Sequence, residues 1–240
     1  MILPRQSLIA AVVAAMTVAA LPALAQETKP AVSAAPAESA KPAESAKPAE
    51  QSAETQLPEG KVLPDIPMGK ADAPVTVIEY ASFTCPHCAA FATENFPKLK
   101  AEYIDTGKVK FIQRDVYFDA PGLWAGILAH CGGSEKYYGV AEMLFSGQKE
   151  ILSAKNGEEF AANLRKVGAK ADMTPEQMDA CWADKQMVSD LITTFQTNAS
   201  ADKIEGTPTF IINGETVQNQ PWDELKKVLD TKVAEAEAKK

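Results

Sequence analysis

The cysteine pair Cys85 and Cys88 lies between a strand-like run and a helix-like stretch, and this context constrains the fold more than any other feature. The apolar run Val75–Tyr80 comes shortly before the pair, and helix-like residues from Ala89 come directly after it. Cys85 therefore falls at a predicted helix N-terminus, where unpaired N–H groups and the helix dipole favour a thiolate. Only two residues separate the cysteines, so Cys88 can resolve a mixed disulfide formed at Cys85. The pattern predicts a redox-active dithiol.

Zinc is the alternative for any Cys-x-x-Cys pair, but a structural zinc site normally needs a second close pair of ligands. The other two cysteines, Cys131 and Cys181, are far apart in the sequence, and the only histidine besides His87 is His130. We therefore expect neither a metal nor any other cofactor.

The first 25 residues have the order of a secretory signal peptide. A short segment with Arg5 is followed by the apolar stretch Leu8–Ala20 and by Ala23-Leu24-Ala25, an A-x-A-type cleavage site before Gln26. Glutamine after the cut does not indicate a lipoprotein anchor. We expect export to the periplasm, where disulfides persist. The alternative is an uncleaved anchor that holds the protein to the membrane facing the periplasm, although the apolar core is short for a full span.

Residues 26–60 are of low complexity and predict a disordered tether. The sequence Pro-Ala-Glu-Ser-Ala-Lys starts at Pro36 and again at Pro42, and a third copy begins at Pro48. The segment has almost no large apolar side chains with which to offset the entropy of ordering.

The charge of the chain argues against two classes of partner. Without Arg5, which lies in the predicted signal peptide, 23 of the 24 basic residues remain against 32 acidic ones. No basic stripe is present, so we expect neither nucleic acid nor anionic lipid to be the main partner.

Residues 61–240 are numerous enough for one well-packed domain. Val75–Tyr80 and Val109–Val116 predict two strands, and the helix between them makes a β-α-β unit with parallel strands. Pro97 is expected to kink that helix rather than end it. The helix carries large apolar residues at three- to five-residue intervals, namely Phe91, Phe96, Leu99 and Tyr103.

The second half begins with a long helical region from Pro121 to about Ala201. The cap-like Thr174-Pro175-Glu176 and several glycines divide it into four or five predicted helices. Those glycines are Gly132, Gly133, Gly157 and Gly168. Two strands, Thr209–Ile212 and Glu215–Val217, then flank Asn213-Gly214, which is typical of a two-residue type I′ turn. A final amphipathic helix carries Trp222, Leu225, Leu229 and Val233 on one face.

This order of elements resembles the DsbA-like branch of the thioredoxin superfamily, over roughly residues 62–235. Two short motifs carry the resemblance. One is Glu79-Tyr80-Ala81-Ser82-Phe83-Thr84-Cys85-Pro86-His87-Cys88, and the other is Gly206-Thr207-Pro208-Thr209-Phe210. The first contains the Cys-Pro-His-Cys active site of the family, and the second resembles its cis-proline loop. The resemblance implies an α/β protein with a thioredoxin fold and a helical domain inserted at about residues 120–201.

The resemblance also implies roles for the residues of the first motif. Cys85 is the expected nucleophile, Cys88 the expected resolving thiol, and together they form the redox-active disulfide. Pro86 fixes φ at an early helical position, where no N–H is needed. His87 is expected to stabilise the Cys85 thiolate, and its alternative is a solvent-facing helix residue. Glu79 is expected to relay protons to and from Cys88.

Two features leave alternatives open. Glu79 could instead pair with Arg114 or Lys110, since an ionised carboxylate inside an apolar strand is costly without a partner. Pro208 is expected to be cis, with the Thr207 backbone pairing with an extended substrate chain. However, Thr207 departs from the valine common in the best-known oxidases of the branch. Threonine at that position also occurs in isomerases and reductases.

Cys131 and Cys181 are a further departure, because the simplest members of the family lack an additional pair. An exported chain with an even number of cysteines favours a structural disulfide between them. The alternative is two separate buried thiols.

These features predict an exported thiol-disulfide oxidoreductase that introduces disulfide bonds into unfolded or reduced exported polypeptides. By resemblance, a quinone-linked membrane protein of the DsbB type would reoxidise it, and a monomer is the default state. A disulfide isomerase or reductase on the same fold is the first alternative. The second is a non-redox periplasmic chaperone that uses an apolar groove around Phe83 and Pro208.

Overall fold

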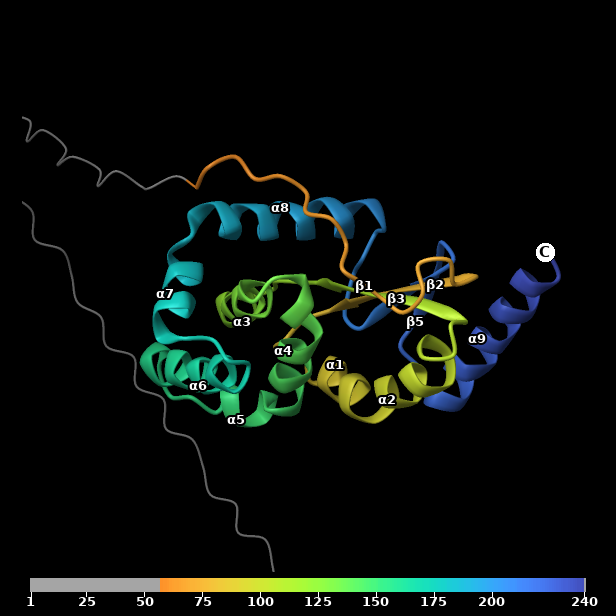
Figure 1. Ribbon diagram of the computed structural model, residues 1–240, viewed down its shortest axis with the longest axis horizontal. Coiled ribbons are helices and arrows are strands. Elements are labelled where there is room, and N and C mark those ends of the chain that lie inside the picture. Colours follow the sequence, from red (N-terminus) through yellow and green to blue (C-terminus); the bar gives the residue numbers. More distant parts are fainter. Residues whose placement is uncertain (1–56, 240) are drawn as a thin grey trace, which may run out of the picture. The chain divides into compact units, whose positions relative to one another are not determined.

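A mixed five-stranded sheet lies at the centre of the described part of the chain, residues 57–239 of the computed structural model (Figure 1). The strands follow the order β1-β3-β2-β4-β5, in which β2 and β3 are parallel and the other neighbours are antiparallel. They span Pro67–Met68 (β1), Val75–Ala81 (β2), Val109–Asp115 (β3), Thr209–Ile212 (β4) and Glu215–Gln218 (β5). The predicted signal peptide and almost all of the predicted tether lie outside the described residues.

The predicted β-α-β unit is present, and its helix continues past Pro97. The helical segment runs through α1 (Pro86–Ala90), η1 (Phe91–Asn95), α2 (Phe96–Leu99) and η2 (Lys100–Ile104), where η1 and η2 are π-helical. These π-helical stretches lie on both sides of Pro97 and accommodate the irregularity without ending the helix. Of its predicted inner face, Phe91, Leu99 and Tyr103 are almost inaccessible to solvent, and Phe96 is partly buried.

The helical insertion spans residues 120–201, as predicted, but it contains six helices rather than four or five. They are α3 (Ala120–Cys131), α4 (Ser134–Ser146), α5 (Gln148–Leu152), α6 (Gly157–Lys170), α7 (Pro175–Ala183) and α8 (Lys185–Ala201). Gly147 separates α5 from α4 and was not recognised as a break. Gly168, in contrast, lies inside α6 and does not end it. An added Cβ at this position would collide with Met178 of α7, so the close packing of the two helices explains the glycine. It is a close-packing position rather than a helix end.

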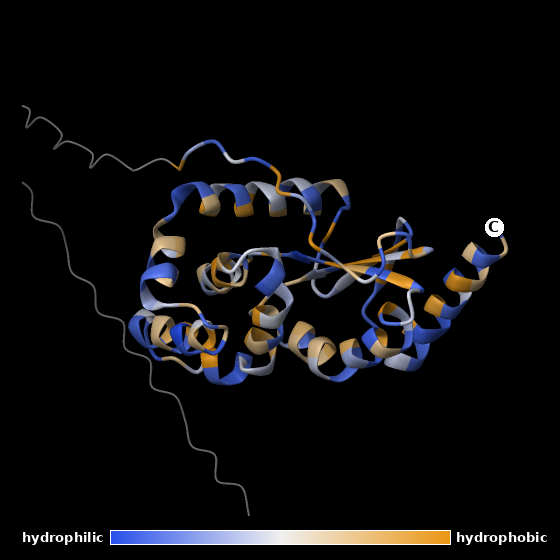
Figure 2. Cartoon of the chain, in the orientation of Figure 1, coloured by the Kyte–Doolittle hydropathy of each residue, from blue (hydrophilic) through white to orange (hydrophobic). Residues whose placement is uncertain are grey.

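The C-terminal part follows the prediction closely. Asn213 and Gly214 join β4 to β5 with positive φ angles of 49° and 86°, as a type I′ turn requires. The last helix, α9 (Trp222–Glu237), buries Leu225, Leu229 and Val233 against the sheet. Figure 2 shows the central strands mainly in hydrophobic colours and α9 with hydrophobic and hydrophilic stretches that alternate along its length.

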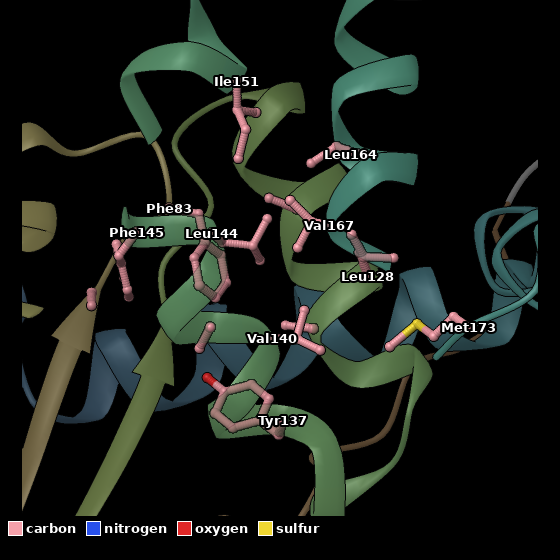
Figure 3. Packing of buried hydrophobic residues seen from close by; sticks show 14 of the residues in the cluster. Phe83, Leu128, Tyr137, Val140, Leu144, Phe145, Ile151, Leu164, Val167 and Met173 are labelled. Atoms are coloured by element: carbon pink, nitrogen blue, oxygen red, sulfur yellow. The ribbon is translucent and has the colours of Figure 1, made fainter. Parts of the chain in front are cut away.

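The two larger hydrophobic clusters among the described residues hold the helices and the sheet together. One lies between the sheet, the α1–η2 segment and α9. The other fills the helical insertion and includes Leu128, Leu144, Leu164 and Phe83 (Figure 3). Phe83, which precedes the cysteine pair, thus anchors the active-site loop in the insertion. No helix among residues 57–239 has the length and apolar character needed to cross a membrane.

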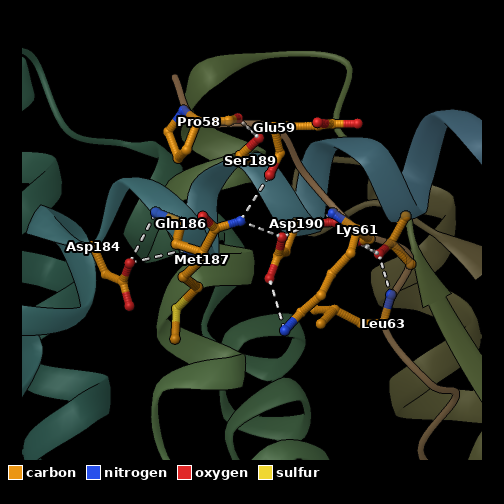
Figure 4. A network of polar contacts seen from close by, with 10 residues as sticks. Pro58, Glu59, Lys61, Leu63, Asp184, Gln186, Met187, Ser189 and Asp190 are labelled. Atoms are coloured by element: carbon orange, nitrogen blue, oxygen red, sulfur yellow. Dashed lines mark hydrogen bonds and ion pairs between the residues drawn. The ribbon is translucent and has the colours of Figure 1, made fainter. Parts of the chain in front are cut away.

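The segment directly before the sheet is held along α8 (Figure 4). Ser189 Oγ donates to the Pro58 carbonyl oxygen (2.6 Å), and the Lys61 N–H donates to Asp190 Oδ1 (2.9 Å). Gly60 lies so close to α8 that a Cβ would collide with the backbone of Ser189. The predicted boundary between tether and domain, at residue 60, is therefore displaced, since Pro58–Gly60 pack with the domain.

Candidate active site

Cys85 and Cys88 lie at the N-terminus of α1, at the point where the chain leaves the carboxyl end of β2. Cys85 is the N-cap residue, with extended backbone angles (φ −82°, ψ 119°), and Pro86 occupies the first helical turn. Cys85 is half-buried, whereas Cys88 has a relative exposure of 0%. Both are free thiols in this structure. The first sulfur thus faces the helix N-terminus and solvent, while the second points into the protein.

The loop before β4 closes the site from the opposite side. The Thr207-Pro208 peptide bond is cis, as the sequence predicted. The Cys85 thiol donates a hydrogen bond to the Thr207 carbonyl oxygen (3.3 Å). The antiparallel pairing of β4 with β2 brings these two loops together, although they are more than 100 positions apart in the sequence. The predicted substrate-binding residues Thr207 and Pro208 therefore lie beside Cys85.

His87 is exposed on the first turn of α1, directly after Pro86. It shares that turn with Cys85, which is the placement that the sequence predicted. Its effect on the Cys85 thiolate remains a prediction.

Two polar side chains of the helical insertion hold the active-site loop, and the sequence analysis missed both. Gln148 Nε2 donates to the carbonyl oxygens of Phe83 (2.9 Å) and Cys85 (3.0 Å). Thr84 Oγ1 donates to Asp119 Oδ2 (2.9 Å), and Asp119 also caps α3 through the Gly122 N–H (2.7 Å). Asp119 before Ala-Pro is a recognisable N-cap signal. A glutamine in a helical run gives no comparable signal.

Glu79 lies in β2 with only 3% of its surface exposed, and its Oε1 atom has no hydrogen-bond partner among residues 57–239. Burial raises the pKa of Glu79 to about 8, with smaller contributions from the charges of Cys85 and Asp115. Burial also raises the pKa of the Cys88 thiol, and the charge of Glu79 adds to this rise. A buried acid and a buried thiol thus interact in a site where charge is costly.

The alternative that Glu79 pairs with Arg114 or Lys110 is wrong. Arg114 bonds Asp65 through Nε and Nη2 (both 2.9 Å) and Asp202 through Nη1 (3.0 Å). Successive residues of a strand point to opposite faces, and Arg114 stacks on Tyr80, so it lies on the other face from Glu79. Lys110 forms no ion pair among the described residues.

Cys131 and Cys181 form a disulfide with an S–S distance of 2.01 Å, so the alternative of two separate thiols is wrong. The bond joins the C-terminal end of α3 to α7, within the helical insertion. Within residues 57–239, no three His, Cys, Asp or Glu side chains cluster as a metal site would require.

The apolar groove expected around Phe83 is not formed by that residue. Phe83 is 3% exposed and stacks on Phe145 of α4 at a centroid distance of 4.9 Å. The inserted helices cover it, which single-residue hydrophobicity could not reveal. Pro208 is also buried.

Comparisons with known proteins agree with this geometry. The thioredoxin family model matches residues 61–231. A Rickettsia bellii protein provisionally named protein-disulfide oxidoreductase is 31% identical over 175 residues, which cover 73% of this chain and 67% of the relative. The Bacillus subtilis disulfide bond formation protein D is 28% identical over 168 residues, 68% of this chain and 76% of that protein. The chain spans about two thirds of the length of the rickettsial relatives.

Solved structures show the same fold. Wolbachia pipientis alpha-DsbA1 superposes with a TM-score of 0.67 at 28% identity, over 75% of this chain and 96% of that one. Oxidised BdbD from Bacillus subtilis superposes with a TM-score of 0.62 at 23% identity, over 75% of this chain and 100% of that one. The predicted thioredoxin fold with a helical insertion is confirmed.

Proposed function

This chain belongs to the thioredoxin family of DsbA-like protein-disulfide oxidoreductases, and from that premise we propose that it is an exported oxidase that introduces disulfide bonds into other exported polypeptides. The unequal exposure of the two thiols carries the proposal. Cys85 is accessible at the helix N-terminus, and Cys88 is fully buried one turn later. A substrate sulfur can reach the first and not the second, which fixes the order of exchange.

The reaction starts from the Cys85–Cys88 disulfide. A substrate thiolate attacks Cys85 Sγ, so that a bond between substrate and Cys85 forms, the Cys85–Cys88 bond breaks and the electron pair passes to Cys88. A second substrate thiolate then attacks the substrate sulfur of this mixed disulfide and releases the Cys85 thiolate. The substrate loses two electrons as its disulfide forms, and the cysteine pair gains them.

The neighbouring residues act on the two sulfurs and on the substrate. Pro86 and the N-terminus of α1 hold Cys85 where the thiolate is favoured, and His87 adds a donor or a positive charge on the same turn. Thr207 and Pro208 bind the substrate chain, with the Thr207 backbone as its pairing partner. Glu79 exchanges a proton with Cys88.

The setting of the reaction follows from the N-terminal sequence and from the family. Residues 1–25 are a cleavable signal peptide, and residues 26–57 tether the domain in the periplasm. The alternative is an uncleaved form that is anchored in the membrane. The partners are reduced or unfolded exported polypeptides, and a quinone-linked membrane protein of the DsbB type reoxidises the pair. The protein works as a monomer and uses no nucleic acid.

The decisive experiment uses the mature chain with Cys85 and Cys88 oxidised, mixed with a reduced, unfolded protein that contains two cysteines. We expect stoichiometric oxidation of the substrate, detected by thiol alkylation and mass spectrometry. Cys85→Ser should abolish this transfer. Cys88→Ser, first loaded as a mixed disulfide between Cys85 and glutathione, should lose glutathione to the attacking substrate thiolate and give a mixed disulfide between Cys85 and the substrate. Equal oxidation by the Cys85→Ser variant would refute the proposal. Binding of unfolded protein that survives in Cys85→Ser, without any oxidation by wild type, would instead favour the chaperone.

An isomerase or reductase is the second candidate because of Thr207. The Thr207 side chain lowers the pKa of the Cys88 thiol and so opposes the rise that burial causes. An easier deprotonation of Cys88 speeds release of a trapped substrate, which an isomerase or reductase needs. The reduction potential in a glutathione buffer separates the candidates. A potential near that of cytosolic reductants, with the pair reduced in the periplasm, would support the second one.

A further inference from the structure

Two acidic residues face the same side of the sheet behind the cysteine pair. In the parallel pairing of β2 with β3, Glu79 lies opposite Gln113 and Ala81 lies opposite Asp115. Side chains alternate along a strand, so residues 79, 81, 113 and 115 point to one face. Neighbouring strands lie about 4.8 Å apart and alternate residues about 6.6 Å apart, which places Glu79 and Asp115 roughly 8 Å apart at their α carbons.

The surroundings of the two acids differ in their hydrogen bonds. Asp115 Oδ1 accepts from Tyr137 Oη (2.5 Å) and from Gln113 Nε2 (3.0 Å). Its Oδ2 accepts from Tyr117 Oη (3.2 Å) and lies 3.1 Å from His130 Nε2. The ionised carboxylate is the form that accepts from every side. Glu79 Oε1, in contrast, accepts no hydrogen bond from any residue in the described part of the chain.

The donors around Asp115 are themselves fixed. Burial and the charge of Asp115 raise the pKa values of Tyr117 and Tyr137 well above the ordinary tyrosine value, so both hydroxyls keep their protons and donate. Gln113 Nε2 also contacts Tyr137 Oη (3.0 Å), which closes the network. Asp115 is thus a buried negative charge held in place by its neighbours, at the end of the strand that pairs with the strand of Glu79.

We propose that Asp115 is a positioning residue that acts through Glu79, because its fixed negative charge adds to the effect of burial in keeping Glu79 protonated in the resting protein. The inference rests on the proposed oxidase function and extends it, since it identifies which acid holds a proton and which holds a charge during the same exchange reaction. Where two acids lie in one site, different surroundings can keep one ionised and the other protonated, and the two then have different roles in the reaction. Asp115 holds the charge, and Glu79 holds the proton.

The proton that Glu79 holds balances the exchange reaction. When substrate attacks Cys85, the electron pair of the broken disulfide bond is left on Cys88, which is buried and therefore a poor place for a charge. Glu79 transfers its proton to that sulfur and becomes a carboxylate, and it regains a proton from water. During reoxidation Glu79 first releases its proton to water, and the resulting carboxylate removes the proton from Cys88, whose sulfur then attacks the mixed disulfide.

Water can reach Glu79 through a cavity of about 120 Å³ between the α1–η2 segment and α4. Lys100 and Glu142 line the same cavity and are the charged groups on that side. The other titratable groups that act on Glu79 or its neighbours are Cys85 and Cys88 at the N-terminus of α1, Tyr137 and Tyr138 of α4, Tyr117 and His130, which contact Asp115, and Asp65. Of these groups, only Asp115 combines a full set of donors with burial on the face of Glu79.

The test compares two carboxylate deletions on opposite faces of the sheet. Asp115→Asn removes the proposed charge, and Asp202→Asn removes a hydrogen-bonded carboxylate that contacts Arg114 and Tyr80 on the other face. Glutamate carboxyl carbons labelled with ¹³C are titrated by NMR in the reduced protein, and the Glu79 signal is identified by its loss in Glu79→Gln. We expect the Glu79 midpoint to fall by about one pH unit in Asp115→Asn and to stay unchanged in Asp202→Asn.

A double-mutant cycle, measured by kinetics, distinguishes an effect of Asp115 that passes through Glu79 from a general loss of structure. The reduced protein is oxidised by glutathione disulfide over a range of pH, and the intramolecular attack by Cys88 is followed. Asp115→Asn should shift this profile to lower pH by the same amount as the NMR midpoint, and should have no further effect in the Glu79→Gln background. An equal shift in that background, or none in the folded single variant, would overturn the inference.

Wild type alone also decides the question if Asp115→Asn does not fold. The ¹³C signal of Asp115 must report the ionised form throughout the range in which Glu79 loses its proton. A wild-type Glu79 that is already ionised near pH 5, or an Asp115 that titrates together with it, would sink the proposal. The NMR readout needs no substrate protein, so a failure of the oxidase function would appear separately, as absent transfer with an intact Glu79 titration.

Discussion

His87 lies on the helical turn whose N-terminus already favours a negative charge on Cys85. Replacing His87 with Ala should therefore move the reduction potential of the Cys85–Cys88 pair to more negative values, because the reduced state loses a stabilising contact. A loss of about 1.4 kcal/mol corresponds to about 30 mV for this two-electron couple. Equilibration with glutathione measures the potential, and thiolate absorbance against pH measures the change at the sulfur.

Lys98→Ala is the matched control for His87→Ala, since Lys98 is an exposed cation three turns further along the same helical segment. Its potential should equal that of wild type. An unchanged potential in His87→Ala would make the histidine a bystander, and the oxidising character would then have to come from the helix N-terminus alone.

Glu79 should make the stability of the reduced protein fall as pH rises. Its pKa is raised from 4.5 to about 8 in the folded state, so between these values the folded protein holds a proton that the unfolded chain has lost. The resulting slope is up to about 1.4 kcal/mol per pH unit between pH 5 and pH 8. Glu79→Gln should remove this slope, so that the variant gains stability relative to wild type towards pH 8. Urea unfolding at several pH values measures it.

The control for that series is Glu94→Gln, which changes an exposed glutamate of the same helical segment. It should leave the pH dependence of the unfolding free energy as in wild type. Parallel curves for wild type and Glu79→Gln would mean that Glu79 is ionised in the folded protein at neutral pH.

At this scale the sequence predicted residues that a local motif contains and missed those that the fold assembles. Cys85, Cys88, Glu79 and Pro208 stand at fixed positions in short motifs, and the structure places all four at one site. Asp115 carries no local signal, because its importance arises from strand register and from tyrosines on another helix. Gln148 is missed for the same reason.

Elements were predictable wherever the chain itself marks their ends. Thr174 caps α7 through a capping box with Gln177, and the positive φ angles of the β4–β5 turn match its Asn-Gly sequence. Strand β1 escaped prediction because two residues carry no periodicity. Gly147 was missed as a helix end, and Gly168 was taken for one although it lies inside α6, since a glycine alone does not distinguish a helix end from a close contact.

Gly168→Ala tests that distinction within α6. An added Cβ would collide with Met178 and approach Leu128 Cδ1 to 3.2 Å, so overpacking should outweigh the better helix propensity of alanine. We expect the unfolding free energy to fall by about 1–2 kcal/mol. In α4, Gly139→Ala meets no atom within 4 Å, so the same change there should raise it by about 0.5–1 kcal/mol. Thermal and urea unfolding of both variants measure the two opposite signs. A gain in both would show that Met178 moves aside at little cost.

The whole molecule depends on how the helical insertion is joined to the sheet. Gln148, Asp119 and Phe83 connect the insertion to the active-site loop, and the segment Pro58–Leu63 lies along α8 before it enters the sheet. The sequence predicted the order of these parts but not their contacts, because each contact joins side chains far apart in the chain. The insertion therefore supports the site as well as covering it.

The disulfide between Cys131 and Cys181 should stabilise this insertion without taking part in the exchange. It closes a loop of 50 residues, which is worth about 4 kcal/mol in the chain-entropy model. Replacing both cysteines with Ala should lower the unfolding free energy by up to that amount and leave the rate of exchange at Cys85 unchanged. The bond joins α3 to α7, away from the residues that contact the active-site loop. Urea unfolding and substrate oxidation measure the two effects. Four free thiols in the air-oxidised protein, or an exchange rate that falls in proportion to stability, would contradict a purely structural role.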